Sequence, residues 1–126
     1  MRLLLDTHAL LWALAAPARL PSATSAAIRD PSNAIYVSAA SVWELAIKAA
    51  LGKVKADVDE VARSAAEVGF DELAVTFAHA RRVRALPPHH RDPFDRMLVA
   101  QALEEGLTIV TRDRSFGDYR VATAWG

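Results

Sequence analysis

Leu3-Leu4-Leu5-Asp6-Thr7-His8 stands near the start of the 126-residue chain and contains the pattern from which its architecture can be worked out. Three consecutive apolar residues predict a strand that is covered on both faces, as in a parallel sheet packed between helices. Asp6 follows this strand directly, and the alanine-rich segment after Thr7 is typical of a helix that ends at Pro17. The chain therefore opens with a strand, an acidic residue and a helix.

The same alternation of strands and helices continues to the end of the sequence. Strands joined by helices pair in parallel and are covered by those helices on their faces. We therefore expect an α/β fold: a single domain over residues 1–126 with a mostly parallel central sheet flanked by helices, an α/β/α sandwich. Further strands are expected at residues 34–37, 70–73, 107–111 and 119–124, and further helices at 21–30, 41–51, 57–68, 76–84 and 92–105.

The composition is that of a folded protein rather than a disordered one. Hydrophobic residues make up 52% and charged residues 24% of the chain, and the mean hydropathy is +0.12. No cysteine is present, which excludes disulfide bonds, thiolate catalysis and cysteine-based zinc sites. Lysine plus arginine and aspartate plus glutamate each number 15, so any nucleic-acid binding must use a local patch rather than a global positive charge.

We expect a cytoplasmic protein that does not associate with a membrane. No uninterrupted apolar segment approaches the roughly 18 residues that a membrane span needs. The apolar start of the chain has some likeness to a secretory signal, but Asp6 and His8 interrupt it. These observations favour the cytoplasm.

Four acidic residues lie beside apolar runs of the expected strands and helices. Side chains just past the ends of parallel strands meet in one crevice, although they are far apart in sequence. Carboxylates gathered there repel one another unless cations or protons neutralise them, and the hard ions Mg²⁺ and Mn²⁺ prefer oxygen ligands. Such ions activate water and stabilise charge in phosphoryl transfer. We therefore predict a metal site built from Asp6, Glu44, Asp95 and Asp113.

Each of these acids also has a structural explanation when it is considered alone. Ser41 and Glu44 match the capping-box pattern at the start of a helix. Asp92 is a good N-cap before a proline, and Asp95 would lie in the first helical turn, where the helix dipole favours negative charge. Asp113 could form an Asx turn. Four independent caps have no reason to share one crevice, so their joint placement favours a site.

Arginines that are close to these acids in sequence are candidates for contacts with RNA. A metal nuclease needs cations around its acidic centre, since they hold the phosphates on either side of the scissile bond. The alternative is that the arginines are solvated helix ends. The candidates are Arg91, Arg96, Arg112 and Arg114.

The sequence does not assign roles to the histidines and aromatic residues. His8 could contact the acidic site or pack through a hydrogen bond, while His89 and His90 could assist RNA binding or orient the helix start that follows them. Aromatic residues at apolar helical positions favour core packing over base stacking. The residues to which this applies are Trp12, Trp43 and Phe94.

Four strings, each with one of the acids, are similar to a known family. They are Leu4-Leu5-Asp6-Thr7-His8, Val37-Ser38-Ala39-Ala40-Ser41-Val42-Trp43-Glu44, His90-Arg91-Asp92-Pro93-Phe94-Asp95-Arg96 and Thr111-Arg112-Asp113. In this order the strings resemble the PIN-domain ribonucleases, specifically the VapC-type toxins. Any single string is weak, whereas four at compatible separations are specific. The resemblance runs from Leu3 to about Tyr119 and is loose over residues 56–85.

This resemblance implies an α/β/α fold, RNA cleavage that depends on Mg²⁺ or Mn²⁺, inhibition by a cognate VapB-type antitoxin, and a homodimer. The metal-site acids of the family fall on Asp6, Glu44, Asp95 and Asp113. Asp92 matches a further acid that could bind metal or cap the helix. The polar positions expected to support the acids or a water molecule are Thr7, Ser38 and Thr111.

Three other classes of protein could share an acidic α/β pocket. A receiver-like signalling module resembles a pattern with paired acids after the first strand and a late lysine, but Asp6 is alone and no lysine follows Lys55. A phosphatase of the haloacid-dehalogenase type begins with Asp-x-Asp, whose second aspartate is missing here. A catalytically silent protein-interaction module remains open, because an apolar docking surface looks like core in a sequence.

Overall fold

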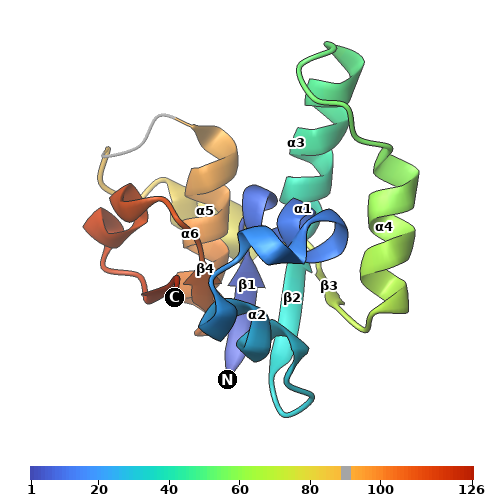
Figure 1. Cartoon of the computed structure of the whole chain (residues 1–126). Coiled ribbons are helices and arrows are strands. Elements are labelled where there is room, and N and C mark those ends of the chain that lie inside the picture. Colours follow the sequence, from blue (N-terminus) through green and yellow to red (C-terminus); the bar gives the residue numbers. More distant parts are fainter. Residues whose placement is uncertain (89–91) are drawn as a thin grey trace.

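A computed structural model describes residues 1–88 and 92–126 of the chain. Its centre is a five-stranded sheet of order β3-β2-β1-β4-β5, in which all four strand pairings are parallel (Figure 1). The expected α/β class and parallel sheet are thereby confirmed. The strands are β1 (Arg2–Leu5), β2 (Ala34–Ser38), β3 (Asp71–Leu73), β4 (Thr108–Val110) and β5 (Thr123–Ala124).

Helices cover both faces of this sheet, as the apolar strands require. In Figure 1, α1, α3 and α4 lie on one side of the sheet, and α5 and α6 lie on the other. The helices are α1 (Thr7–Ala15), α2 (Ser22–Arg29), α3 (Ala39–Ala50), α4 (Val58–Glu67), α5 (Phe77–Val83) and α6 (Pro93–Glu105), with short 3-10 helices η1 (Pro17–Arg19) and η2 (Arg114–Tyr119).

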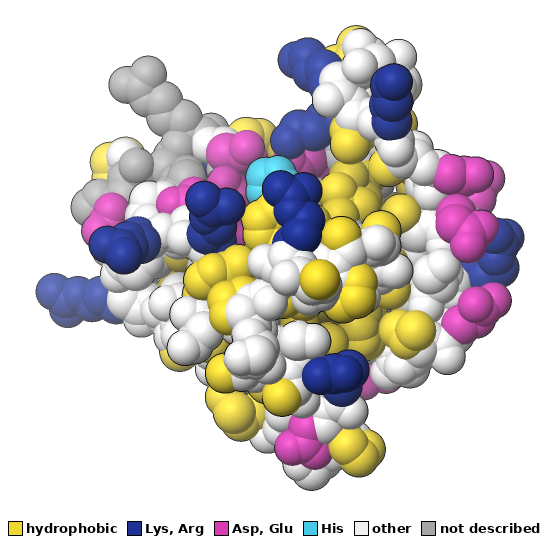
Figure 2. Space-filling view, viewed as in Figure 1, with side chains coloured by type: hydrophobic (Ala, Val, Ile, Leu, Met, Phe, Trp, Pro, Cys, Tyr) yellow, Lys and Arg dark blue, Asp and Glu magenta, His cyan; other side chains and the backbone are white. Residues whose placement is uncertain are grey.

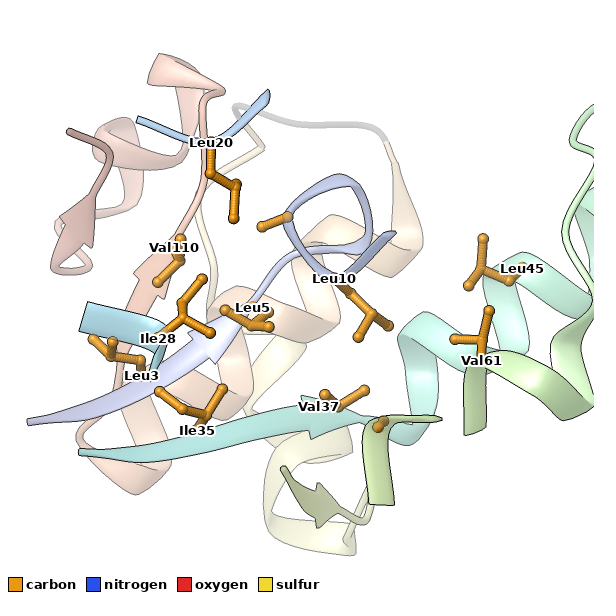
Figure 3. Packing of buried hydrophobic residues seen from close by; sticks show 12 residues of the cluster. Leu3, Leu5, Leu10, Leu20, Ile28, Ile35, Val37, Leu45, Val61 and Val110 are labelled. Carbon is orange, nitrogen blue, oxygen red and sulfur yellow. The ribbon is translucent and has the colours of Figure 1, made fainter. Parts of the chain in front are cut away.

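The first strand divides the hydrophobic core into two clusters. Leu3 and Leu5 pack with residues of α1 to α4, such as Leu45 and Val61, on one face (Figure 3). Leu4 points to the opposite face and packs in the cluster that contains the apolar residues of α6. All three leucines are at most 1% exposed, so the central strand is anchored on both sides. Its carboxyl end is therefore a rigid place from which to project a side chain.

The register of the sheet brings three strand ends to one level. Leu5 pairs with Val37 of β2 on one side and with Val110 of β4 on the other. The backbone N–H of Asp6 continues the pairing by donating to the carbonyl of Val110 at 3.1 Å. Residues that follow β1, β2 and β4 consequently emerge at the same edge of the sheet.

Two elements differ from the sequence-based expectation. The third helix begins at Ala39 rather than Ser41, because Ser38 takes the N-cap position and its Oγ accepts from the Ala40 N–H at 3.0 Å. Ser41 lies inside the helix and is buried, and its Oγ has no hydrogen-bond partner among the described residues. The expected strand over 119–124 is reduced to two residues, since the segment before it forms η2 and Arg120 then adopts a left-handed conformation (φ 58°).

Among the residues that the structure describes, no helix has the length and apolar character that spanning a membrane would require.

Candidate functional site

The four predicted acids all lie at the edge where the central strands end. Asp6 follows β1 and caps α1, while Asp113 follows β4 and caps η2. Glu44 lies in the second turn of α3, and Asp95 lies in the first turn of α6. In Figure 2 a group of Asp and Glu side chains gathers near the top of the face drawn, with Lys and Arg side chains beside it. Four segments that are distant in sequence thus contribute carboxylates to one region.

Asp6 is held by hydrogen bonds in a buried position. Its side chain is 8% exposed, and Oδ1 accepts from the backbone N–H of Ala9 at 2.8 Å. Burial raises the pKa of Asp6 above 3.8, and the charge of Asp113 adds to this, while hydrogen bonds from Thr111 and Ala9 lower it. Ionisation of the Asp6 carboxyl is therefore unfavourable, and a nearby cation would make it more favourable.

Glu44 is fixed by two donors from opposite sides. The hydroxyl of Thr7 donates to Oε1 at 2.6 Å, and the ammonium of Lys48 donates to Oε2 at 2.5 Å. The hydrogen bond to Glu44 is the largest cause that raises the pKa of Lys48. Lys48 was not among the predicted site residues, although its position four residues after Glu44 on a helix could have indicated the pair.

Asp95 experiences the combined charge of the other acids. Burial is the largest cause that raises its pKa to about 7, followed in order by the charges of Asp92, Glu44, Asp6 and Asp113. Asp92 itself caps α6, where its Oδ1 accepts from the N–H groups of Phe94 and Asp95. All five carboxylates are therefore close enough to interact electrostatically.

Asp113 forms the Asx turn that its sequence context suggested. Its Oδ1 accepts from the backbone N–H of Ser115 at 2.9 Å and from the Ser115 hydroxyl at 2.5 Å. The Oγ1 of Thr111 accepts from the Asp113 N–H at 3.0 Å and also contacts Asp6. Thr111 therefore links the two acids that follow β1 and β4.

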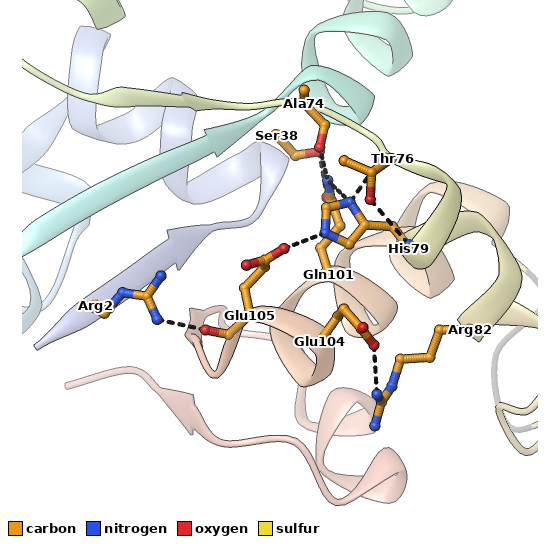
Figure 4. A network of polar contacts seen from close by, with 9 residues as sticks. All are labelled: Arg2, Ser38, Ala74, Thr76, His79, Arg82, Gln101, Glu104 and Glu105. Atoms are coloured by element: carbon orange, nitrogen blue, oxygen red, sulfur yellow. Dashed lines mark hydrogen bonds and ion pairs between the residues drawn. The ribbon is translucent and has the colours of Figure 1, made fainter.

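Ser38, the third polar residue expected to support the acids, has a different environment. It is fully buried, and its hydroxyl donates to Oε1 of Gln101 on α6 at 2.6 Å (Figure 4). No hydrogen bond between Ser38 and an acid of the site is found in the described part of the chain. Ser38 instead joins the start of α3, the helix of Glu44, to α6, the helix of Asp95.

The donor chemistry of the site fits a hard divalent cation. Carboxylate oxygens are the ligands that Mg²⁺ and Mn²⁺ prefer. The pKa of Asp95 is raised first by burial and then by the charges of the other acids, and a bound cation would offset both effects. Within residues 1–88 and 92–126, no three Asp, Glu or His side chains are already arranged to hold one ion. The residues that could provide such a site are Asp6, Glu44, Asp92, Asp95 and Asp113.

The predicted arginines differ in how they are used. Arg96 donates to the carbonyls of Pro87 at 2.8 Å and Val83 at 3.2 Å, so its guanidinium ties α6 to the segment after α5. Arg112 and Arg114 are exposed next to Asp113. Arg91, like His89 and His90, lies outside the described residues.

The aromatic residues only partly follow the expectation of core packing. Trp12 is half-buried against the core around Leu3, in agreement with it. Trp43 is 62% exposed and touches Phe94 edge-on, with 5.0 Å between ring centroids, so the expectation was wrong for Trp43. Its helical position faces outward because α3 buries Leu45 and Glu44 instead.

Comparisons with known proteins agree with this fold. The family model described as PIN domain matches residues 3–122. Ribonuclease VapC22 of Mycobacterium tuberculosis is 33% identical over 124 residues, which cover 93% of this chain and 91% of that protein. The structure of VapBC2 from Rickettsia felis bound to a promoter DNA fragment has a TM-score of 0.73 at 15% identity, covers all of both chains, and therefore shows a shared fold. FitAcB from Neisseria gonorrhoeae has a TM-score of 0.61 at 26% identity, over 96% of this chain and 95% of that one.

Proposed function

The chain belongs to the PIN-domain family, and from that membership we propose that it is a divalent-metal-dependent endoribonuclease, the toxin of a VapBC-type toxin–antitoxin pair. The observation that carries the proposal is the convergence of carboxylates from four separate segments on the region around Asp95. The name of the relative from Mycobacterium tuberculosis, a VapC ribonuclease, supports the same activity.

The proposed site uses Asp6, Glu44, Asp95 and Asp113 to hold Mg²⁺ or Mn²⁺, with Asp92 as a secondary ligand or cap. A bound cation would supply Lewis-acid stabilisation of the charge that develops on the phosphate oxygens during hydrolysis. The protein does not need a nucleophilic side chain for this chemistry, which is consistent with a site built from carboxylates.

The neighbouring side chains have orienting roles in this proposal. The Thr7 hydroxyl fixes one oxygen of Glu44, and Thr111 bridges Asp6 and the backbone of Asp113. Such outer contacts hold carboxylates in the orientation that a cation needs. Arg112 and Arg114 are exposed beside Asp113 and are the arginines best placed to contact RNA phosphates. Arg96, which binds backbone carbonyls, is a structural residue in this view.

The proposal includes partners and a compartment. VapBC-5 from Mycobacterium tuberculosis, a related structure, is described as a member of the VapBC family of toxin–antitoxin systems. A VapB-type antitoxin is therefore the inhibitor that we expect for this chain. A homodimer is expected from the family resemblance and from the commonness of twofold dimers. A cytoplasmic location is expected because Asp6 and His8 interrupt the apolar start of the chain. Receiver-like and haloacid-dehalogenase alternatives lose support, because the PIN-domain match extends over nearly the whole chain.

The test is incubation of the purified, antitoxin-free protein with total RNA in the presence of Mg²⁺, Mn²⁺ or a chelator, followed by mapping of the cut ends. Discrete cuts that require metal and are missing in the Asp95→Asn variant are expected. If the folded protein makes no cut with either metal, the proposal fails and a protein-interaction role becomes the better explanation.

A further inference from the structure

A hollow of about 450 Å³ opens directly beside two of the acids. Its volume is within the roughly 300–1,000 Å³ range of small-molecule binding pockets. Its wall combines carboxylates, a guanidinium and aromatic rings. The lining residues are Asp6, His8, Trp12, Arg112, Asp113 and Trp125.

The aromatic wall comes from opposite ends of the sequence. Trp12 on α1 and Trp125 after β5 have their ring centroids 5.8 Å apart at an interplanar angle of 51°, and His8 lies 6.2 Å from Trp12. Both tryptophans are half-buried: they pack against the core around Leu3 and also line the hollow. This arrangement supplies rigid, amphipathic ring surface next to the acids.

Positive charge accompanies these rings. The guanidinium carbon of Arg19 lies 4.8 Å from the centroid of the Trp12 ring, and Arg112 forms part of the wall itself. An apolar peptide groove would have no use for acids and arginines inside it, whereas a strand of nucleic acid presents both flat rings and phosphates. Aromatic side chains combined with cations are the usual means of binding unpaired bases.

We propose that this hollow binds an unpaired RNA base next to the scissile phosphate, stacked on the Trp12–Trp125 wall, while Arg112 contacts the adjoining phosphate. The inference rests on the proposed ribonuclease function and deepens it, because it assigns Trp12, Trp125 and Arg112 to the nucleotide beside the cut. A base in a duplex is stacked on its neighbours and could not enter. The hollow is continuous with Asp6 and Asp113, so a phosphate held at the acids places its own base within reach.

Tryptophan fluorescence gives a direct readout of the stacking. The chain has three tryptophans, so a Trp43→Phe variant retains only those of the hollow. In an Asp95→Asn background that prevents cutting, this protein is titrated with a single-stranded oligoribonucleotide of roughly 12 nucleotides, which is within the site sizes of single-strand binders. Quenching is expected with this RNA and not with inorganic polyphosphate or duplex RNA. Equal quenching by polyphosphate would overturn the proposal, as would quenching by an arginine-rich peptide without any by RNA.

Substitution of Trp125 tests whether this residue affects RNA binding without affecting the rate of cleavage. Trp125→Leu is expected to weaken binding of the oligonucleotide about tenfold or more, the effect of losing one stacked base. In a protein with all four acids, the same change should raise KM for RNA and leave kcat nearly unchanged. Trp125→Phe keeps a ring and should restore most of the binding. Trp43→Leu, which removes an exposed tryptophan outside the hollow, serves as the matched control, and thermal melting verifies that each variant is folded.

The outcomes distinguish this inference from the function on which it depends. If the unaltered protein cuts RNA and Trp125→Leu cuts it with an unchanged KM, the stacking proposal fails and the ribonuclease stands. If the unaltered protein never cuts RNA, the proposed function fails whatever the tryptophans do.

Discussion

Polar side chains are buried in two regions of this protein, around Gln101 and at the acidic edge of the sheet. The two regions differ in whether burial is offset by hydrogen bonds. Around Gln101 every buried polar group has a partner: the amide oxygen accepts from Ser38, and the amide nitrogen donates to the carbonyl of Ala74 at 3.3 Å (Figure 4). His79 continues the network, since its Nδ1 accepts from the Thr76 N–H and its Nε2 lies 2.8 Å from Glu105. At the acidic edge, burial instead raises the pKa values of Asp6 and Asp95.

The contrast separates a structural network from a candidate site. Hydrogen bonds around Gln101 satisfy the groups that burial removed from water, so this region stabilises the fold. The acids have hydrogen bonds too, but like charges gathered in one place are unfavourable until something neutralises them. Acidic groups with raised pKa values are concentrated at functional sites of proteins. The function that we propose for these acids is the binding of a cation.

The largest effect is expected from Asp95→Asn, which removes one charge from the acidic edge with little change in shape. Cleavage of RNA should fall by at least about 100-fold, since both charge stabilisation and cation binding are impaired. Initial rates on a mapped RNA substrate measure this. Asp118→Asn, which alters an exposed aspartate on η2, is the control and should cut at the normal rate. A fully active Asp95→Asn protein would remove this residue from the metal site.

Gln101→Leu should affect the other region and lower the free energy of unfolding by about 2–3 kcal/mol. The change leaves the buried Ser38 hydroxyl and the Ala74 carbonyl without their partner. Urea denaturation measures the loss. In a double-mutant cycle, Ser38→Ala and Gln101→Leu should be less than additive, because they break the same hydrogen bond. Strict additivity would contradict the shared network.

The free energy of unfolding should depend on pH because the folded state disfavours the ionised form of Asp95. Its pKa is 3.8 ordinarily and about 7 in the folded protein, so between these values the folded chain binds more protons than the unfolded one. In chelator, the free energy of unfolding should therefore fall as pH rises from about 4 to about 7.

Asp95→Asn should lack this part of the pH dependence. Above pH 7 this variant should be about 1 kcal/mol more stable than the unaltered protein. The expected difference is small because solvent screens the charge of a partly exposed group. Thermal melts across the pH series provide the measurement. Identical slopes in the two proteins would show that the folded state does not disfavour the ionised form of Asp95.

The smallest effect is expected for Lys48→Met. Lys48 holds one oxygen of Glu44 at 2.5 Å and so competes with a cation for that carboxylate. Its removal should lower the Mg²⁺ concentration for half-maximal cleavage a few-fold and change stability by less than about 1 kcal/mol, since the lysine is 42% exposed. A higher Mg²⁺ requirement would mean that Lys48 instead holds Glu44 in the orientation that the metal needs.

The sequence predicted the architecture well where a local pattern carried the information. The apolar triplet before Asp6 correctly gave a strand buried on both faces, and proline and glycine marked the ends of α6. The start of α3 was misplaced because Ser38 and Ser41 are both good N-caps, and only tertiary packing decides between them. The choice depends on Gln101, which lies 63 positions later and accepts from Ser38.

The positions of the four acids in the fold were predictable from the sequence, whereas the contacts around them were not. Acids at strand ends follow from topology, so Asp6 and Asp113 could be placed at the same edge of the sheet. The contact of Trp12 with Trp125 and the buried position of His79 depend on long-range packing that leaves no local signal. The hydrogen bond from Arg96 to the carbonyl of Pro87 likewise leaves no local signal in the sequence.

The strand order has a consequence for the time at which this protein could begin to act. Asp6 is made long before β4, the strand that pairs with β1 and aligns Asp113 beside Asp6. Domains acquire their structure as synthesis proceeds from the N-terminus. A nascent or prematurely terminated chain thus lacks an essential wall of its own acidic pocket. Under the proposed function, the chain could therefore cut RNA only after β4 has been made and paired with β1.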